Sequence, residues 1–168
     1  MGNSHYFMIN ISLDIHIRAN RKVVWAYMSD ILLSLAHNRL HREIIPNGSS
    51  HARKGREFVI SHRTFLGTHD MHAIIQECIP WECIQIHESF QNPRTKGFLH
   101  TCTFHMTPSS KGTKLIYTLE GTFGNLVQNF MYKPIARGIM LEELFRIKHA
   151  IESSEPTLDL KAQQLKPI

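Results

Sequence analysis

FLHTCTFHMTPSSKGTKLIYTLEGTF, residues 98–123, is the stretch that decides the fold of this chain. Apolar and polar residues alternate on both sides of a Pro-Ser-Ser-Lys-Gly turn, which predicts two half-buried strands paired as an antiparallel hairpin. An amphipathic helix is predicted directly after the second strand. Because a long hairpin that leads into a C-terminal helix can enclose an apolar space, a bound ligand is the first function to test.

The segments before this hairpin predict one strand, two short helices and a meander of further strands. Residues 8–18 alternate, with an isoleucine or leucine at every odd position from 9 to 17, so they predict a half-buried strand. Asn20 can cap a helix that runs to about Ser29, and Asp30 can begin a second short helix. The remaining strands are predicted at 56–64, 68–78, 82–90, 97–107 and 113–123, with short connections that imply antiparallel pairing.

The last predicted element is a helix over roughly residues 126–152. Pro134 lies inside it and is expected to kink the helix or split it in two, because proline removes one backbone donor. The polar tail at 153–168 is expected to be poorly ordered. The apolar stripe of the helix is predicted to consist of Leu126, Phe130, Met140, Leu144, Ile147 and Ile151, widened by Leu141 and Phe145.

This order of elements predicts an α+β fold. A curved antiparallel sheet of about six or seven strands wraps around the long C-terminal helix, and two short helices follow the first strand. Its 168 residues suffice for one domain, which we place at 8–152. No apolar run approaches the roughly 20 residues that cross a bilayer, and the N-terminus lacks the pattern of a secretory signal, so we expect a cytoplasmic protein.

The chain is basic, with a formal net charge of +5. Such a surplus can attract an acidic lipid surface or an acidic protein, or it is simply a solvated face. Nucleic acid is not expected as a partner, because aromatic residues do not alternate with the basic ones. The basic residues that cluster along the chain are Arg39, Arg42, Arg53, Lys54, Arg56 and Arg63.

Three segments carry a resemblance to a known superfamily. They are the strand and helix start at 15–25, the strand-turn-strand passage around Pro80 at 76–84, and the hairpin with Gly112-Thr113 after its turn. With the proline-containing last helix, they resemble the START-like helix-grip superfamily, also called SRPBCC, and most of all its polyketide cyclase/dehydrase and lipid-transport branch. The resemblance covers about residues 8–152 and implies a deep apolar cavity between the sheet and the last helix.

Strand parity nominates residues that face this cavity, and two of them are polar. His100 and Tyr117 can orient a ligand carbonyl or hydroxyl group, or act as proton donor and acceptor in a cyclase. The alternative is a buried pair whose hydrogen bonds are made to protein neighbours. The residues predicted to bind the ligand are Phe58, Met71, Phe98, His100, Phe104, Met106, Tyr117, Leu119 and Phe130.

Twelve histidines raise the question of a metal. His37 and His41 are four residues apart and would share a helix face, but no third ligand is implied by spacing, and His69 and His72 would point to opposite faces of a strand. We therefore expect no metal and no cofactor. Neither a nucleophile elbow nor a glycine-rich phosphate loop is present in the sequence.

The sequence favours a protein that binds a hydrophobic or amphipathic small molecule, such as a lipid, a polyketide or a quinone-like compound. Two alternatives stay open at this point. One is an aromatase/cyclase-type enzyme that acts on a polyketide-like substrate. The other is a protein-interaction module that uses the apolar groove. The ligand and the oligomeric state do not follow from the sequence.

Overall fold

The computed structural model describes residues 8–64, 67–90, 97–123 and 125–164, with side chains described up to residue 154. Seven strands form one antiparallel sheet in the order β1-β7-β6-β5-β4-β3-β2. The elements along the chain are β1 (Ile9–Ile17), α1 (Arg21–Met28), α2 (Ile31–Ser34), a 3₁₀ helix η1 (Leu35–His37), β2 (His41–Pro46), β3 (Glu57–Thr64), β4 (Gly67–Ile79), β5 (Cys83–Phe90), β6 (Leu99–Ser109), β7 (Gly112–Thr122) and α3 (Leu126–Gln164). The predicted α+β fold is confirmed.

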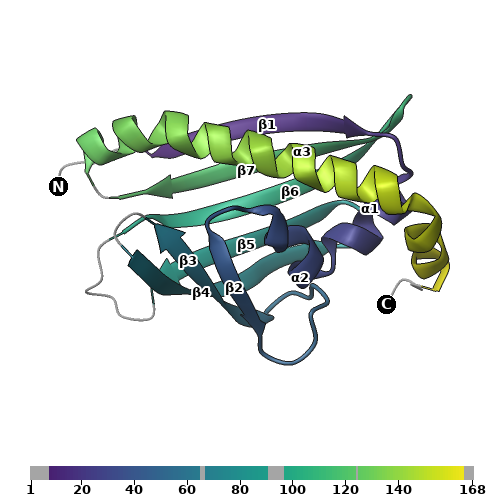
Figure 1. Ribbon diagram of the computed structural model, residues 1–168, viewed down its shortest axis with the longest axis horizontal. Coiled ribbons are helices and arrows are strands. Elements are labelled where there is room, and N and C mark those ends of the chain that lie inside the picture. Colours follow the sequence, from purple (N-terminus) through teal and green to yellow (C-terminus); the bar gives the residue numbers. More distant parts are fainter. Residues whose placement is uncertain (1–7, 65–66, 91–96, 124, 165–168) are drawn as a thin grey trace.

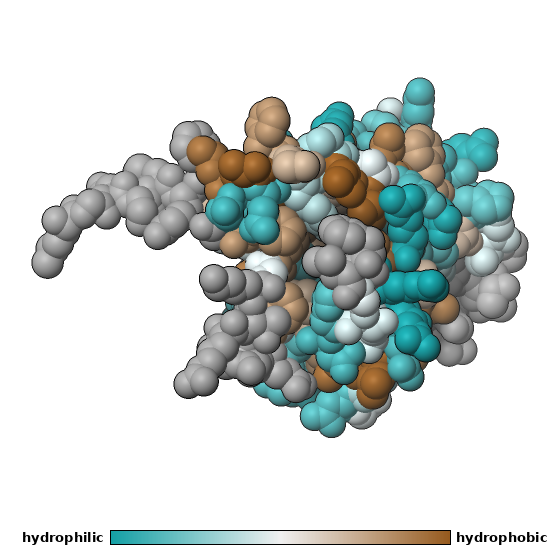
Figure 2. Space-filling model, turned by 60° about the vertical axis from the view of Figure 1, so that its left-hand side comes forward, coloured by the Kyte–Doolittle hydropathy of each residue, from teal (hydrophilic) through white to brown (hydrophobic). Residues whose placement is uncertain are grey.

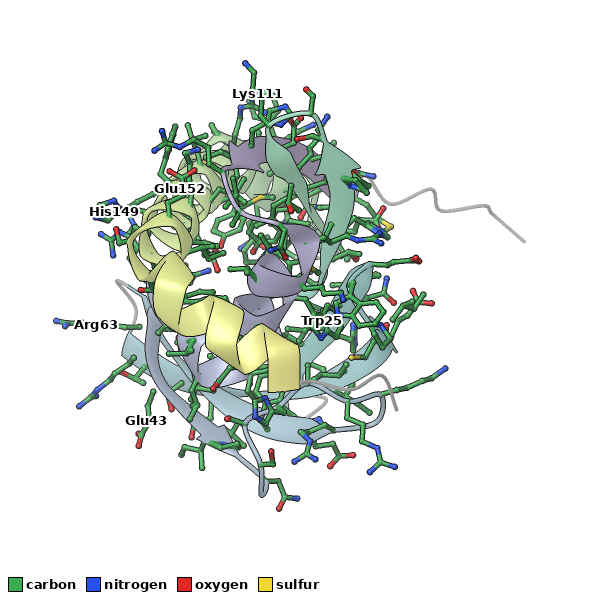
Figure 3. All side chains as sticks on the ribbon, turned by 90° about the vertical axis from the view of Figure 1, so that its right-hand side faces the viewer. Trp25, Glu43, Arg63, Lys111, His149 and Glu152 are labelled. Carbon is green, nitrogen blue, oxygen red and sulfur yellow. The ribbon has the colours of Figure 1, made fainter. Side chains whose placement is uncertain are left out.

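Helix α3 lies along one face of the sheet, and α1 and α2 lie on the same face near the C-terminal part of α3 (Figure 1). The view from that end shows the sheet curving around the helices, with Lys111 at one margin and Glu43 and Arg63 at the other (Figure 3). A right-handed twist makes such curvature natural, and it lets a single face bury the apolar surface of several helices. The space between β5, β6, β7 and α3 is therefore the interior of the protein.

The sequence signals at the element ends act as expected. The side chain of Asn20 accepts a hydrogen bond from the backbone N–H of Val23, and Asp30 accepts one from Leu32, so each caps its helix. At the tip of the β6–β7 hairpin, Gly112 has a φ of 121°, and a Cβ there would meet the backbone oxygen of Ile17 at 2.3 Å. This turn therefore requires glycine.

Strand β2 was not predicted, and two histidines were therefore assigned to the wrong element. The prediction put His37 and His41 on one helix face, but His37 ends the 3₁₀ helix and His41 begins β2, where it pairs with His62 of β3. The six residues of β2 show no regular alternation of burial, because a register shift lies between His41 and Glu43. The period-two signal was therefore missing.

The last helix also differs from the prediction. It is continuous from Leu126 to Gln164, so Pro134 does not split it and its end lies beyond the expected residue 152. A proline removes only one backbone donor, and a helix can continue past it with a bend. Figure 1 shows α3 bending within its yellow C-terminal part.

Half of the predicted stripe on α3 faces away from the sheet. Met140, Leu144, Ile147 and Ile151 are buried, but the inward face continues toward the N-terminus through Ala136, Tyr132 and Asn129. Leu126, Phe130, Leu141 and Phe145 share another face of the helix and are exposed. Steps of three and four residues can drift around a long helix, so periodicity alone did not identify the buried face.

Candidate functional site

A row of polar side chains crosses the inner face of the sheet, where apolar residues would be expected. Alternation along β5 places Glu88 on the same side as the buried Ile84 and Ile86. Its direct neighbour on β6 is His100, and on β4 it faces Ala73, whose small side chain leaves room. Glu88 is only 2% exposed. A buried carboxyl group of this kind must be paired or neutralised.

Two histidines pair with Glu88. His62 Nε2 donates to Glu88 Oε2 at 2.8 Å, and His100 Nε2 lies 3.4 Å from Glu88 Oε1. His100 is oriented from its other side, because its Nδ1 donates to the carbonyl oxygen of Phe98 at 3.0 Å. The Phe98 ring also stacks on the imidazole, with centroids 4.8 Å apart. Both carboxylate oxygens of Glu88 are therefore held in place.

The charge states of Glu88 and His100 depend on each other. Burial alone favours the neutral form of Glu88, but the charge of His100 and hydrogen bonds from both histidines hold the pKa of the carboxyl group well below its usual range. Burial likewise opposes protonation of His100, yet the Glu88 carboxylate beside it raises the pKa of His100 well above its usual range. The two residues form a buried ion pair.

His41 extends the row to the edge strand β2. Its ring meets the ring of His62 edge-on, with centroids 4.8 Å apart, and its Nδ1 donates to the carbonyl oxygen of Leu35 at 2.8 Å. Burial lowers the pKa of His41 to about 4, although Glu88 acts in the opposite direction. His41 is therefore neutral near pH 7.

A second polar group lies between β6, β7 and α3. The hydroxyl group of Tyr117 and the thiol of Cys102 are 3.4 Å apart, and the Phe104 ring stacks on Tyr117 with centroids 4.4 Å apart. Burial raises the pKa of both Tyr117 and Cys102. Across from them, the α3 residue Glu143 is 1% exposed.

Glu143 is the least satisfied polar side chain in this interior. Its Oε2 accepts a hydrogen bond from Asn38 Nδ2 at 3.0 Å, whereas its Oε1 is buried with no hydrogen-bond partner among the described residues. Burial, reinforced by the charge of Glu88, raises the pKa of Glu143 to about 8. A buried polar atom without a partner is costly in a folded protein and often marks a site that a ligand or water completes.

Aromatic and aliphatic side chains surround these polar groups. The Phe98 ring contacts Phe123 and Tyr132 with centroids 4.9 Å away in each case, and Leu119 packs on the same face. Gly121 lies directly opposite His100, and a Cβ at that position would meet His100 and the Phe98 ring at 2.6 and 2.7 Å. Glycine is therefore needed for the ring to lie where it does.

The residues predicted to bind a ligand mostly share this interior. Both polar candidates, His100 and Tyr117, have side-chain partners, and only His100 has a backbone partner as well. Phe130 is 81% exposed on the outer side of α3 and does not share the interior. The buried members of the predicted set are Phe58, Met71, Phe98, Phe104, Met106, Tyr117 and Leu119.

The sequence reasoning missed three polar residues of the site, His62, Glu88 and Glu143, and it considered His41 only as a partner of His37. A signal existed for Glu88, since it continues the inward positions of two isoleucines on a strand that was predicted correctly. No such signal existed for His41 and His62, because their approach to Glu88 depends on the order of strands in the sheet. His37, the residue that was expected to lie beside His41, instead forms a hydrogen bond with the hydroxyl group of Tyr27.

The outer surface has two features of its own. A hollow of about 360 Å³ lies outside the sheet at the loop before β3, lined by Asn47, Arg53, Lys54, Gly55, Arg56 and Glu57. Exposed apolar residues gather on the first turns of α3, and Figure 2 shows hydrophobic side chains along this part of the surface. Those residues are Leu126, Val127, Phe130, Met131 and Ile135. Interaction with a protein or an acidic lipid surface stays a prediction.

None of the described helices is both long enough and apolar enough to span a membrane.

Neither a family model nor a curated protein sequence matches this chain. Solved structures do match it. Protein CV1439 from Chromobacterium violaceum has a TM-score of 0.63 at 18% identity, over 85% of this chain and 97% of its own. The Zhui aromatase/cyclase from Streptomyces sp. R1128 has a TM-score of 0.69 at 11% identity, over 88% and 95%. Ara h 8.0201 has a TM-score of 0.66 at 7% identity, over 87% and 99%.

These identities are low, so the likeness concerns the fold. The likeness extends over 85–88% of this chain, which itself has an open seven-stranded sheet, short helices after β1 and a long C-terminal helix. The chain has a helix-grip fold, as its sequence segments predicted.

Proposed function

We propose that the protein binds a hydrophobic or amphipathic small molecule between the sheet and α3. The apolar body of the ligand packs against the aromatic and aliphatic side chains of β6 and β7. Its one polar group, a hydroxyl or carbonyl, lies beside Tyr117 and Glu143. The observation that carries the proposal is the buried oxygen Oε1 of Glu143, which has no hydrogen-bond partner among the described residues.

The state of Glu143 indicates what kind of polar group fits. With a pKa near 8, the carboxyl group is mostly neutral at pH 7, so it can donate one hydrogen bond as well as accept others. A ligand carbonyl can accept that bond, and a ligand hydroxyl can donate to Oε1. A ligand carboxylate would lie near the ionised Glu88 and is disfavoured by its charge.

The apolar part of the ligand supplies most of the affinity. Burial of each methylene group contributes about 0.8 kcal/mol, so a chain of roughly ten carbons gains enough to offset the cost of association. Buried side chains line this interior, so entry of the ligand requires the side chains or α3 to move. The first half of α3 is the element suited to move, because five of its apolar residues are exposed rather than packed.

The test is a displacement titration with a fluorescent fatty acid, followed by hydroxyl- and carbonyl-bearing competitors. Glu143→Met keeps a side chain of similar length without a strong hydrogen-bond donor or acceptor, so it is expected to weaken binding of carbonyl and hydroxyl ligands without abolishing binding of the probe's chain. The matched control is Glu142→Met, on the preceding residue of α3, which pairs with Arg146 at the surface. If no lipophilic probe binds to the wild-type protein, the proposal fails.

A second candidate is an aromatase/cyclase-type enzyme, and the buried Glu143 across from Tyr117 favours it. Proton transfer from a carbon next to a ketone requires a base, and a neutral donor must stabilise the enolate oxygen that forms. With its pKa raised to about 8, Glu143 is suited to serve as the base when it is ionised, and the hydroxyl group of Tyr117 can serve as the donor. The Zhui protein, called an aromatase/cyclase, has the same fold. From that protein, the proposal takes over for this chain only the class of reaction.

This candidate is tested with model polyketones followed by chromatography and mass spectrometry. Tyr117→Phe and Glu143→Gln are expected to lower turnover by at least about 100-fold while leaving ligand binding measurable. Turnover that is equal in both variants would remove the enzyme function and leave the binding function in place.

A further inference from the structure

Three donor atoms meet at one point where strands β2, β3 and β5 face the interior. One atom each from His41, His62 and Glu88 lies within 4.8 Å of the other two. The residues come from sequence positions that span 48 residues, from 41 to 88. Two imidazoles and one carboxylate form a donor set that binds divalent transition metals, zinc above all.

Two of the three donors are held by partners of the kind found around metal sites. His41 Nδ1 donates to the carbonyl oxygen of Leu35 at 2.8 Å, which leaves the lone pair of the ring on Nε2. The second oxygen of Glu88 is held by His100, whose own Nδ1 is bonded to the carbonyl oxygen of Phe98. Backbone carbonyls and carboxylates orient metal-binding histidines in this way and fix the ring tautomer.

The distances suit a small ion. Ligand atoms placed about 2.0–2.1 Å from a tetrahedral zinc ion are roughly 3.3 Å apart. His62 Nε2 and Glu88 Oε2 are 2.8 Å apart, and the widest separation in the group is within 4.8 Å, so the ideal value lies between them. Side-chain movements that shift the three donor atoms by less than about 1.5 Å therefore place all of them at bonding distance from one zinc ion.

We propose that His41, His62 and Glu88 form a zinc site with three protein ligands and water at the fourth position. On binding, the hydrogen on His62 moves from Nε2 to Nδ1, so that the Nε2 lone pair and a carboxylate oxygen of Glu88 face the ion, which lies between the two side chains. His41 is partly exposed at the edge strand, which gives the ion a path to the site. His100 positions Glu88 and does not bind the ion.

The neighbouring group of Glu88, His100 and Cys102 is the competing arrangement, because its donor atoms also lie within 4.8 Å of one another. It would use a thiolate. The two arrangements share Glu88 and differ in whether sulfur or His41 binds the metal. A cobalt ion distinguishes them, since a thiolate ligand adds a strong charge-transfer band in the near ultraviolet.

The test uses the full-length protein after treatment with a chelator. Equilibrium dialysis against zinc, with metal analysis, is expected to give one tightly bound ion per chain. His41→Gln should weaken that binding by more than the roughly 100-fold that loss of an outer partner costs. His105→Gln, at an exposed histidine on β6, should bind zinc as the wild type does. Cobalt-loaded protein should show visible d–d bands without the thiolate band.

Three results overturn the site: no stoichiometric zinc uptake by the wild type, uptake unchanged in His41→Gln, or a thiolate band that Cys102→Ser removes. Because His62 is buried and its variants can misfold, His41→Gln is the primary variant, and circular dichroism confirms its fold. His62→Gln is then examined in the same way. Retained uptake in a folded His62→Gln variant would also contradict the site.

Discussion

Replacement of Glu143 with glutamine is expected to make the free energy of unfolding less dependent on pH. In the folded protein the pKa of Glu143 is about 8, against an ordinary value of 4.5. Between these values the folded protein keeps a proton that the unfolded chain releases. The wild-type free energy of unfolding therefore falls as pH rises, by about 1.4 kcal/mol per pH unit from this group alone.

The stability that this group contributes is fully present below the unfolded pKa and is lost as pH rises through the folded pKa. From about pH 5.5 to about pH 7.5, the loss amounts to roughly 2.7 kcal/mol in the wild type. Glutamine does not titrate, so the variant gains that amount relative to the wild type over the same interval. Glu88, His100 and Tyr117 face Glu143 from three strands, and they remain present in both proteins.

Urea denaturation followed by circular dichroism at the two pH values measures this difference. Glu142→Gln serves as the control for loss of a carboxyl group from the same helical turn. If the difference between Glu143→Gln and wild type is the same at both pH values, Glu143 is not held neutral in the interior. The hydrogen-bonding role proposed for it would then be wrong.

Three further outcomes follow from packing and charge. Gly121→Ala should cost about 1–3 kcal/mol of stability, because its Cβ would meet His100 and the Phe98 ring. Gly138→Ala, whose Cβ would have no atom within 4 Å, should instead stabilise the protein by about 0.5–1 kcal/mol. Urea denaturation measures both changes. Leu144→Ala should cost about 2–5 kcal/mol and the exposed Leu141→Ala less than about 0.5, and equal losses would contradict the assigned inward face of α3. Burial opposes ionisation of Glu152, but hydrogen bonds from Lys148 and Arg18 together outweigh it and lower the pKa of Glu152 to about 2. The destabilisation caused by Glu152→Gln, measured as a Tm difference, should therefore shrink as pH falls from 4.5 toward 2. A difference that stays constant would count against this pairing.

Much of the fold could be predicted because its strands carry strong local patterns. The alternation of Ile9 to Ile17 and the two arms of the hairpin around Gly112 match β1, β6 and β7 to within two residues at each end. The caps Asn20 and Asp30 were also visible in the sequence. Where the pattern is broken by a register shift, as in β2, local reasoning failed.

The site was predictable only in part. His100 and Tyr117 stood out because each is a polar residue at an inward position of a predicted strand. Glu143 could not be identified, since the stripe assigned to α3 mixed its inner and outer faces. The meeting of His41 and His62 with Glu88 depends on strand order and register, which one sequence does not contain.

The most direct test of the ligand-binding interior is native mass spectrometry of the full chain purified without organic solvent. We expect a species heavier than the bare polypeptide, whose excess mass disappears on denaturation and reappears when the extracted compound is returned. A Leu119→Trp variant, which fills part of the interior, should lose that species, while Leu141→Trp at the surface should keep it. A protein that always appears at its bare mass and takes up no lipophilic compound would contradict the account.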